Sequence, residues 1–289
     1  MAATNGQEVN GSTSGVRKND FSAPQGNNNI SDQENGYLTS YQTASSVVIP
    51  REVFESMYLT PYTQRLGHLR STFGNPTPMP LMGFLIASMP LGCNLMGWRG
   101  SGGDGAAIIG LFFFFGGMLQ VLGSVLEWIL GNTFPFVVFA CYGAFWLAMG
   151  VTLTPTYEAQ SYFTKAGDTA QFYSSFSFFW MVMALVTFFF LIASLRTNLV
   201  FVLVFVFIDL AFILLMATYW SLAEGKTATA GKLHQAAGAF IFVFCVFGWY
   251  LFLGMILSAV DFPFSLPTGD LSTKFKGASE RKKDATSEK

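Results

Sequence analysis

Three side chains that can carry a proton or form hydrogen bonds lie inside otherwise apolar stretches. Gln120 and Glu127 are seven residues apart, which places them on one helix face, two turns from each other. Asp209 has only Phe, Val and Ile neighbours one turn away, and an isolated carboxylate in hydrocarbon is costly. We therefore expect Asp209 to face other helices and to find a donor or stay protonated. Glu127 and Asp209 are candidate proton carriers. A solvated Glu127, and an Asp209 that only ties its helix to a neighbouring hydroxyl, are the open alternatives.

The segment Asn75–Pro80, with the sequence NPTPMP, has three prolines in five positions. Proline lacks a backbone N–H, so we expect this segment not to form a regular helix. Irregular backbone at membrane depth is tolerated only against protein or a water-filled cavity. The pattern therefore predicts the cytoplasmic mouth of a pathway at Asn75, Pro76 and Pro78, where the Asn75 amide offers a donor and an acceptor. A linker that ends at a proline is an equally supported alternative.

The residue types that metal, cofactor or covalent chemistry requires are scarce. The sequence has two histidines, His68 and His234, and three cysteines without a CxxC spacing, so we expect no metal site and no cofactor. Ser88, Ser124 and Ser177 have no histidine or lysine close in sequence to act as a base, which argues against an enzyme. The net charge of −1 argues against a nucleic-acid-binding protein.

Hydropathy predicts the elements that must position these residues. Of the 289 residues, 52% are hydrophobic, and only 11 of the 33 charged residues fall within 71–260. A stretch of about 20 apolar residues crosses the hydrocarbon core as a helix. Six such stretches predict an all-α integral membrane protein embedded in the lipid bilayer. The predicted spans are residues 80–98, 106–130, 135–154, 174–195, 198–220 and 233–258.

The polar segments divide the chain around this transmembrane domain, residues 75–260. Residues 1–50 are rich in Asn, Gly and Ser and predict a disordered tail, and residues 261–289 predict a second polar tail. Residues 51–74 predict a short amphipathic helix on the membrane surface or, equally, an ordinary polar linker. Six spans place both termini on one side, and the segments on that side carry 12 of the 16 Lys and Arg residues. Both termini are therefore predicted to be cytoplasmic.

The order and spacing of several sequence blocks resemble one known family. Asn-Pro-Thr-Pro at residues 75–78, continued by Leu-Met-Gly-Phe at 81–84, is similar to the Asn-Pro-Ala-Pro-Leu-Gly-Leu signature of the acetate uptake transporters, also called succinate–acetate permeases. The further matching blocks are Phe115–Gln120, Glu127–Phe134, Tyr142–Trp146, Phe212–Leu215 and Leu266–Gly269. The long polar N-terminal segment resembles the fungal branch of that family.

The resemblance implies six helices per subunit around one pathway, assembled as a homo-hexamer with one pore per subunit, in the plasma membrane. It implies passage of acetate and other small monocarboxylates, coupled to protons. The constriction of the family falls by position on Phe84, Tyr142 and Ile208, where Phe84 and Ile208 form a hydrophobic gate. The substrate path is predicted to include Asn75, Pro76, Pro78, Gln120 and Trp146, with hydrogen bonds donated by the Asn75 and Gln120 amides and the Tyr142 hydroxyl.

Other functions remain open at this stage. Ammonia or ammonium export has been attributed to the fungal branch, although the sequence has no pair of histidines like that of ammonia channels. A succinate-type dicarboxylate permease would also fit the family. A signalling or scaffold role for the tails would leave the proline-rich segment and the intramembrane acids without an explanation.

Overall fold

The computed structural model describes residues 73–271 and residue 274, which all fall within one compact unit, Ile49–Lys289. Within the described residues the regular structure is helical, apart from an isolated bridge between Asn198 and Asp270. Six helical segments are long and apolar enough to cross a membrane, which confirms the all-α class and the number of spans. They are α4 (Pro78–Leu95), a composite segment (Gly103–Ile129) that ends in α6 (Gln120–Ile129), α7 (Thr133–Leu153), α9 (Thr169–Ser194), α10 (Leu199–Ala223) and α11 (Thr227–Ala259).

The predicted spans match these helices except at a few ends. The helix α9 begins at Thr169 instead of 174, because the Asp168 side chain accepts a hydrogen bond from the backbone N–H of Gln171 at 3.1 Å and caps the helix. A short helix that the sequence analysis did not predict, α8 (Ala159–Lys165), connects α7 to α9. The predicted tail at 1–50 and nearly all of the predicted surface helix at 51–74 lie outside the described residues.

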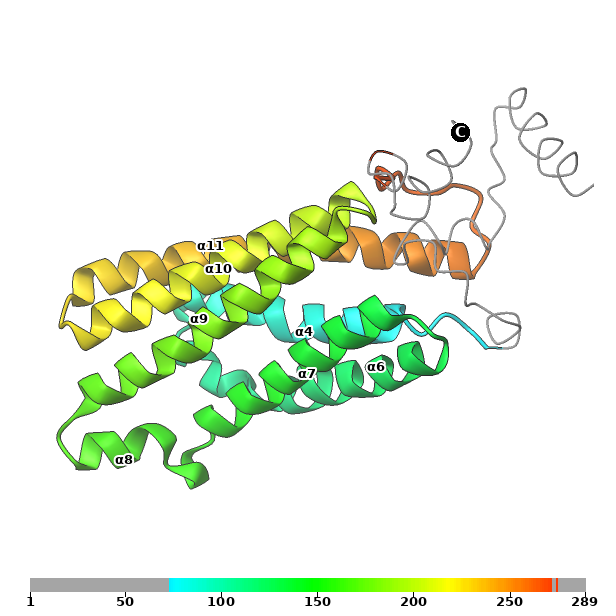
Figure 1. Ribbon diagram of the computed structural model, residues 1–289. Helices are drawn as coiled ribbons and strands as arrows, with labels where there is room; N and C mark the ends of the chain where they lie inside the picture. The colour runs from blue at the N-terminus through cyan, green and yellow to red at the C-terminus, as the bar shows by residue number, and fades with distance from the viewer. Residues whose placement is uncertain (1–72, 272–273, 275–289) are drawn as a thin grey trace, which may run out of the picture. The chain divides into compact units, whose positions relative to one another are not determined.

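The helices pack side by side in one bundle (Figure 1), and contacts between successive neighbours connect them into a closed ring. The helix α10 packs between α9 and α11, and α4 packs against α11 on one side and α6 on the other. The helix α7 packs against α6 and reaches α9 through aromatic contacts, such as that between Phe145 and Trp180 with ring centroids 5.7 Å apart. The buried side chains of all six spans face the interior of this ring.

The backbone of the proline-rich segment is irregular at residues 75–77, but it is helical from Pro78 on, so the prediction of irregular backbone is wrong for Pro78 and Pro80. The helix α4 begins at Pro78, and Pro80 lies in its first turn. The first four N–H groups of a helix have no intrahelical acceptor, so proline at these positions removes no hydrogen bond. Asn75 Oδ1 accepts a hydrogen bond from Thr77 N at 3.1 Å, which fixes the turn before the helix.

The second span is interrupted by a π-helix, η4 (Phe112–Leu119), immediately before α6. The π-helix contains Gly116 and Gly117, which leave room for side chains of α7. A Cβ at Gly116 would lie 2.5 Å from Cγ of Trp146, so the indole ring rests directly on the glycine backbone. The side chain of Gln120 donates through Nε2 to the carbonyl of Gly116 at 2.7 Å and adds a hydrogen bond to the widened turn.

Close approach between α4 and η4 depends on Gly83. A Cβ at this position would lie 2.4 Å from the carbonyl oxygen of Phe115, which is backbone and cannot rotate away. We expect Gly83→Ala to lower the thermal unfolding temperature of the detergent-purified protein, at an overpacking cost of about 1–3 kcal/mol. Gly110→Ala is the matched control, since a Cβ there meets nothing within 4 Å. Equal unfolding temperatures for the two variants would show that the helices separate freely at this point.

Residues 266–271 attach to the bundle next to the start of α10. Leu199 N donates to Gly269 O at 2.8 Å, and Leu271 N donates to Thr197 O at 3.0 Å. The first of these bonds satisfies an N–H group at the beginning of α10 that has no intrahelical acceptor. The block Leu266–Gly269 therefore holds the end of a transmembrane helix, while the predicted tail beyond residue 274 lies outside the described residues.

Candidate functional site

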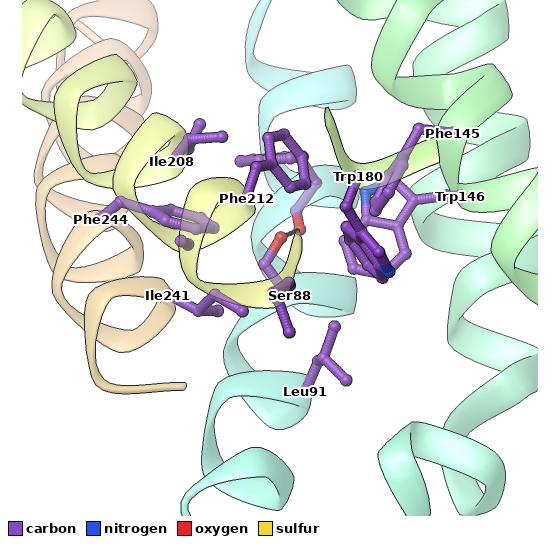
Figure 2. Close-up of a pocket in the computed structure, with 12 residues that line it drawn as sticks. Ser88, Leu91, Phe145, Trp146, Trp180, Ile208, Phe212, Ile241 and Phe244 are labelled. Carbon is purple, nitrogen blue, oxygen red and sulfur yellow. Dashed lines mark hydrogen bonds between the residues drawn. The ribbon is translucent and has the colours of Figure 1, made fainter. Parts of the chain in front are cut away.

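A small cavity lies inside the helix ring, with walls from α4, α7, α9, α10 and α11 (Figure 2). Its lining is apolar or aromatic except for Ser88, whose hydroxyl donates to the carbonyl of Phe84 at 2.7 Å. The space open to the centre of a water molecule is about 20 Å³, which is enough for about one water. The centre of the bundle therefore holds a small cavity without a charged side chain among its lining residues.

The three residues of the predicted constriction lie together in the interior. Phe84 and Ile208 line the cavity, and Tyr142 is 3% exposed. The Phe84 ring contacts the rings of Tyr142 and Phe244, each at a centroid distance of 5.4 Å. All three side chains are therefore buried in the interior of the bundle.

Two of the predicted hydrogen-bond donors of the path, Gln120 and Tyr142, already have hydrogen-bond partners within the chain. The Tyr142 hydroxyl and the Thr187 hydroxyl are hydrogen-bonded at 2.9 Å, and Thr187 is fully buried. The amide nitrogen of Gln120 donates to the carbonyl of Gly116. The Gln120 Oε1 is buried without a hydrogen-bond partner among the described residues. The sequence analysis did not identify Thr187, because a hydroxyl in an apolar span carries no sign of its partner.

Two tryptophans of the cavity differ from the other aromatic residues around it. Trp146, predicted from the resemblance, and Trp180, which the sequence analysis missed, are each 2% exposed. The indole nitrogen of each is buried and has no hydrogen-bond partner in the described part of the chain. A usable signal was present in the sequence, since membrane tryptophans concentrate at the two interfaces, whereas both of these lie near the middle of α7 and α9.

Glu127 is fully buried where α4 begins and α6 ends. Its Oε1 accepts a hydrogen bond from the Thr77 hydroxyl, and its Oε2 accepts one from the Asn132 amide at 2.5 Å. The carboxylate thereby joins the N-cap of α4 to the turn between α6 and α7. Asn75, at the predicted mouth, comes two residues before Thr77 and is exposed. Pro76 and Pro78 are partly buried.

Asp209 does not line the cavity, although its neighbour Ile208 does. The residue is partly buried, and its Oδ1 is buried without a hydrogen-bond partner among the described residues. The predicted tie to a neighbouring hydroxyl is therefore not observed for this oxygen. Asp209 is therefore next in sequence to the residues of α10 that line the cavity, without lining it itself.

A larger and more polar cavity of about 520 Å³ lies near the end of the bundle that carries α8. Its lining includes Thr152, Gln160 and Ser161, together with Phe176 and Tyr219. Rings of both Phe176 and Tyr219 contact Trp180, with centroids 5.6 and 6.0 Å apart. Aromatic side chains thus lie between this larger cavity and the central cavity.

The described residues contain no group of three or more His, Cys, Asp or Glu side chains that could hold a metal ion. Near the ends of two spans, His234 Nε2 and Asp104 Oδ1 lie 3.2 Å apart and connect the first turns of α11 to the start of the composite segment. The polar groups available for chemistry are therefore hydroxyl, amide, indole and isolated carboxyl groups.

A ring of six apolar helices around a small, uncharged cavity defines a polytopic α-helical membrane protein. Residues 59–273 match the GPR1/FUN34/yaaH family, and the chain belongs to this family, as the sequence resemblance indicated. The matched region includes all six spans.

Fungal relatives extend the similarity over most of the chain. Protein alcS of Aspergillus fumigatus is 45% identical over 242 residues, covering 81% of this chain and 88% of the relative. Acetate permease A of Emericella nidulans is 32% identical over 213 residues, covering 73% and 71%. Ammonia transport outward protein 3 of Saccharomyces cerevisiae is 30% identical over 178 residues, covering 62% and 61%.

The fold also matches a solved structure. The bacterial acetate channel SatP superimposes with a TM-score of 0.51 at 24% identity, covering 68% of this chain and 99% of that chain. The six-helix arrangement is therefore one that occurs in an experimentally determined membrane protein.

Proposed function

We propose that this chain is a membrane transporter or channel for acetate and other small monocarboxylates, coupled to protons. The observation that carries the proposal is the central cavity, which is narrow, uncharged and bounded by Phe84 and Ile208. The family and the names of relatives such as acetate permease A support the substrate class.

The geometry suits a short acid with one apolar end. A carboxylate that enters hydrocarbon loses its hydration at a large cost, which a pore lowers with hydrogen-bond donors. The Phe84 and Ile208 side chains exclude hydrated ions and accept a methyl group. The hydroxyl pair of Tyr142 and Thr187 lies behind Phe84 and offers a polar contact beyond the apolar constriction.

Asp209 is the better suited of the two candidate proton carriers. Glu127 accepts hydrogen bonds through both oxygens, so its carboxylate is occupied in a structural role. Asp209 has a buried oxygen without a donor and adjoins the cavity residue Ile208. A proton that Asp209 takes up with the passing anion would leave the pair neutral.

The proposal includes a homo-hexamer with one pore per subunit, in the plasma membrane, with both termini cytoplasmic. The distribution of Lys and Arg supports the orientation, and the family resemblance supports the assembly. Large apolar side chains, such as Phe114, Phe178 and Leu185, are exposed on the single chain. Lipid or neighbouring subunits would cover such side chains in the membrane.

Uptake of labelled acetate into liposomes that contain the purified protein tests this function. We expect uptake above that of empty liposomes, saturating with acetate and several-fold faster when the outside is acidic. Asp209→Asn should keep acetate uptake but lose most of this pH response, because the side chain can no longer bind and release a proton. Uptake equal to that of empty liposomes at every pH would contradict the proposed function.

Ammonia export is the second candidate, and the yeast relative named for ammonia transport favours it. Ammonium would need acceptor oxygens, but Ser88 supplies the one polar side chain of the lining besides the two indoles, which only donate. The same liposomes, loaded with ammonium and monitored for efflux, distinguish the two functions. A dicarboxylate fits less well, since its second carboxylate would lie among apolar side chains without a donor.

A further inference from the structure

Aromatic rings of α9 and α10 lie between the larger cavity and the central cavity. Phe176 and Tyr219 line the larger cavity, whereas Trp180 lines the central cavity (Figure 2). The rings of Phe176 and Tyr219 contact that of Trp180 at centroid distances of 5.6 and 6.0 Å, and they contact each other at 5.0 Å. A solute that moves from one cavity to the other on this side of the bundle therefore meets three rings in mutual contact.

The opposite wall between the two cavities is tightly packed. Gly105 lies between Asp104 and Ala106, which both line the larger cavity. A Cβ at Gly105 would lie 2.7 Å from Cζ of Phe112 and 3.1 Å from Cδ1 of Leu91. Leu91 lines the central cavity, and Phe112 is fully buried. Because these side chains rest against a glycine backbone, they have little room to move, and we expect the rings of α9 and α10 to be the part that opens.

We propose that the Phe176 side chain is a gate between the two cavities that opens by rotating toward the larger cavity, an inference that rests on the proposed function. Phe176 is partly buried, whereas Trp180 and Tyr219 are 2% and 8% exposed. Among the described residues, the Phe176 ring contacts Tyr219 on another helix, and its further ring contacts, with Phe172, Phe179 and Trp180, are within α9. Rotation of Phe176 therefore breaks one ring contact between helices.

A closed and an open state of this gate follow from the geometry of a helix. Long and aromatic side chains in a helix occupy either of two common χ1 rotamers. The larger cavity, with about 520 Å³ of open space, is lined by Phe176 and offers room for the ring in the second rotamer. The gate therefore needs no movement of the backbone.

The backbone around the gate is in fact held together. Ser177, the residue after Phe176, is fully buried, and its hydroxyl hydrogen is shared between the carbonyls of Tyr173 at 3.0 Å and Met216 at 3.3 Å. The contact with Met216 joins α9 to α10 one turn before Tyr219. The two helices stay together at this depth, so we expect the side chain to move and the helices to stay in place.

The gate and the predicted constriction lie at different depths of the bundle. Phe176 lies close to the start of α9 and Tyr219 close to the end of α10. Ile208 lies near the middle of α10, and Phe84 lies in the half of α4 that begins at Pro78, away from the larger cavity. A ring that swings aside leaves the path at full width. Phe176 therefore sets the rate of passage, while Phe84 sets the size of the solute that passes.

Phe176→Ala removes the ring, and Phe176→Trp enlarges it. In the liposome assay we expect the alanine variant to raise the maximal acetate and butyrate fluxes several-fold and by a similar factor, and the tryptophan variant to lower both. The ratio of the two fluxes should stay that of the wild type. Phe178→Ala is the control, because Phe178 lies on the same helix and is 54% exposed. Fluxes equal to those of the wild type in both Phe176 variants, each eluting as a single species in size-exclusion chromatography, would overturn the gate.

A thiol in the central cavity measures the opening of the gate without any transport. Ser88 lines this cavity, and methyl methanethiosulfonate, a small neutral reagent, has to cross the aromatic rings to reach Ser88→Cys from the larger cavity. We expect modification of residue 88, followed by peptide mass spectrometry, to become several-fold faster when Phe176→Ala is added. Thr164→Cys, in the larger cavity, should react at the same rate with and without Phe176→Ala. An unchanged rate at residue 88 would also overturn the gate.

The two measurements separate this inference from the proposed function. Acetate flux that does not respond to either Phe176 variant, together with an unchanged thiol rate, removes the gate and leaves the function. A faster thiol reaction in Phe176→Ala, in a protein that gives no acetate flux, keeps a gate at Phe176 and removes the transport function.

Discussion

Replacing Phe84 with alanine is expected to abolish the size selectivity of the path. Phe84 is 7% exposed, and its ring contacts those of Tyr142, Trp146 and Phe244. Removing the ring enlarges the central cavity that Phe84 lines, so a larger monocarboxylate such as butyrate can pass. We expect the ratio of acetate flux to butyrate flux in liposomes to fall about tenfold or more, since apolar pockets discriminate by such factors.

Two further variants test whether a change in the flux ratio is specific to the loss of the Phe84 ring. Phe84→Ala also creates a cavity that costs about 3–5 kcal/mol in a packed core, so the variant must first elute as a single species in size-exclusion chromatography. Phe84→Leu fills more of the space and should retain most of the selectivity. Phe114→Ala, at a residue that is 62% exposed, should leave the flux ratio unchanged. An unaltered ratio in folded Phe84→Ala would remove Phe84 from the constriction.

Replacing Glu127 with alanine is expected to destabilise the junction between α4, α6 and α7 severely. The Thr77 hydroxyl and the Asn132 amide both donate to this fully buried carboxylate. Leaving two buried donors without an acceptor costs about 1–3 kcal/mol each, so we expect a total loss of about 2–6 kcal/mol. Thermal unfolding of the detergent-purified protein, followed by tryptophan fluorescence, should show a lowered transition or no folded protein.

The change in unfolding temperature distinguishes a structural role of Glu127 from a role as a proton carrier. Glu127→Gln keeps one acceptor but turns an N–H group toward one of the two donors. Its unfolding temperature should therefore lie between those of the wild type and Glu127→Ala. Glu224→Ala is the control, because the Glu224–Lys226 pair is more than half exposed on both sides and surface pairs contribute little. If Glu127→Ala unfolds at the same temperature as the wild type and loses only the pH response of acetate uptake, Glu127 is a proton carrier. Its structural role between α4, α6 and α7 is then refuted.

Most of the fold was predictable because its cause is local in sequence. A bilayer requires about 20 apolar residues for each span, and that rule gave the six spans without reference to their packing. The exceptions were also local. Pro78 and Pro80 occupy the first turn of α4, where missing N–H groups cost nothing, and Asp168 starts α9 early by capping it.

The site was predictable only in part. Phe84, Tyr142 and Ile208 came from the family resemblance, and the structure places all three in the interior. Gln120 and Tyr142 were predicted to donate to the substrate, yet both already have partners on neighbouring chain segments. A donor is recognisable in a sequence, but whether it is already bonded depends on which side chain faces it.

The sequence by itself determined that this is a six-span membrane protein, and it located the polar residues that such spans contain. It could not say which face of each span points inward, because the spans are apolar on all sides and carry no amphipathic pattern. Only the tertiary structure decided that Trp146 and Trp180 share one cavity and that Glu127 joins Thr77, 50 residues away, to Asn132. These contacts arise from the packing of helices against one another, and packing joins residues that are far apart in the chain.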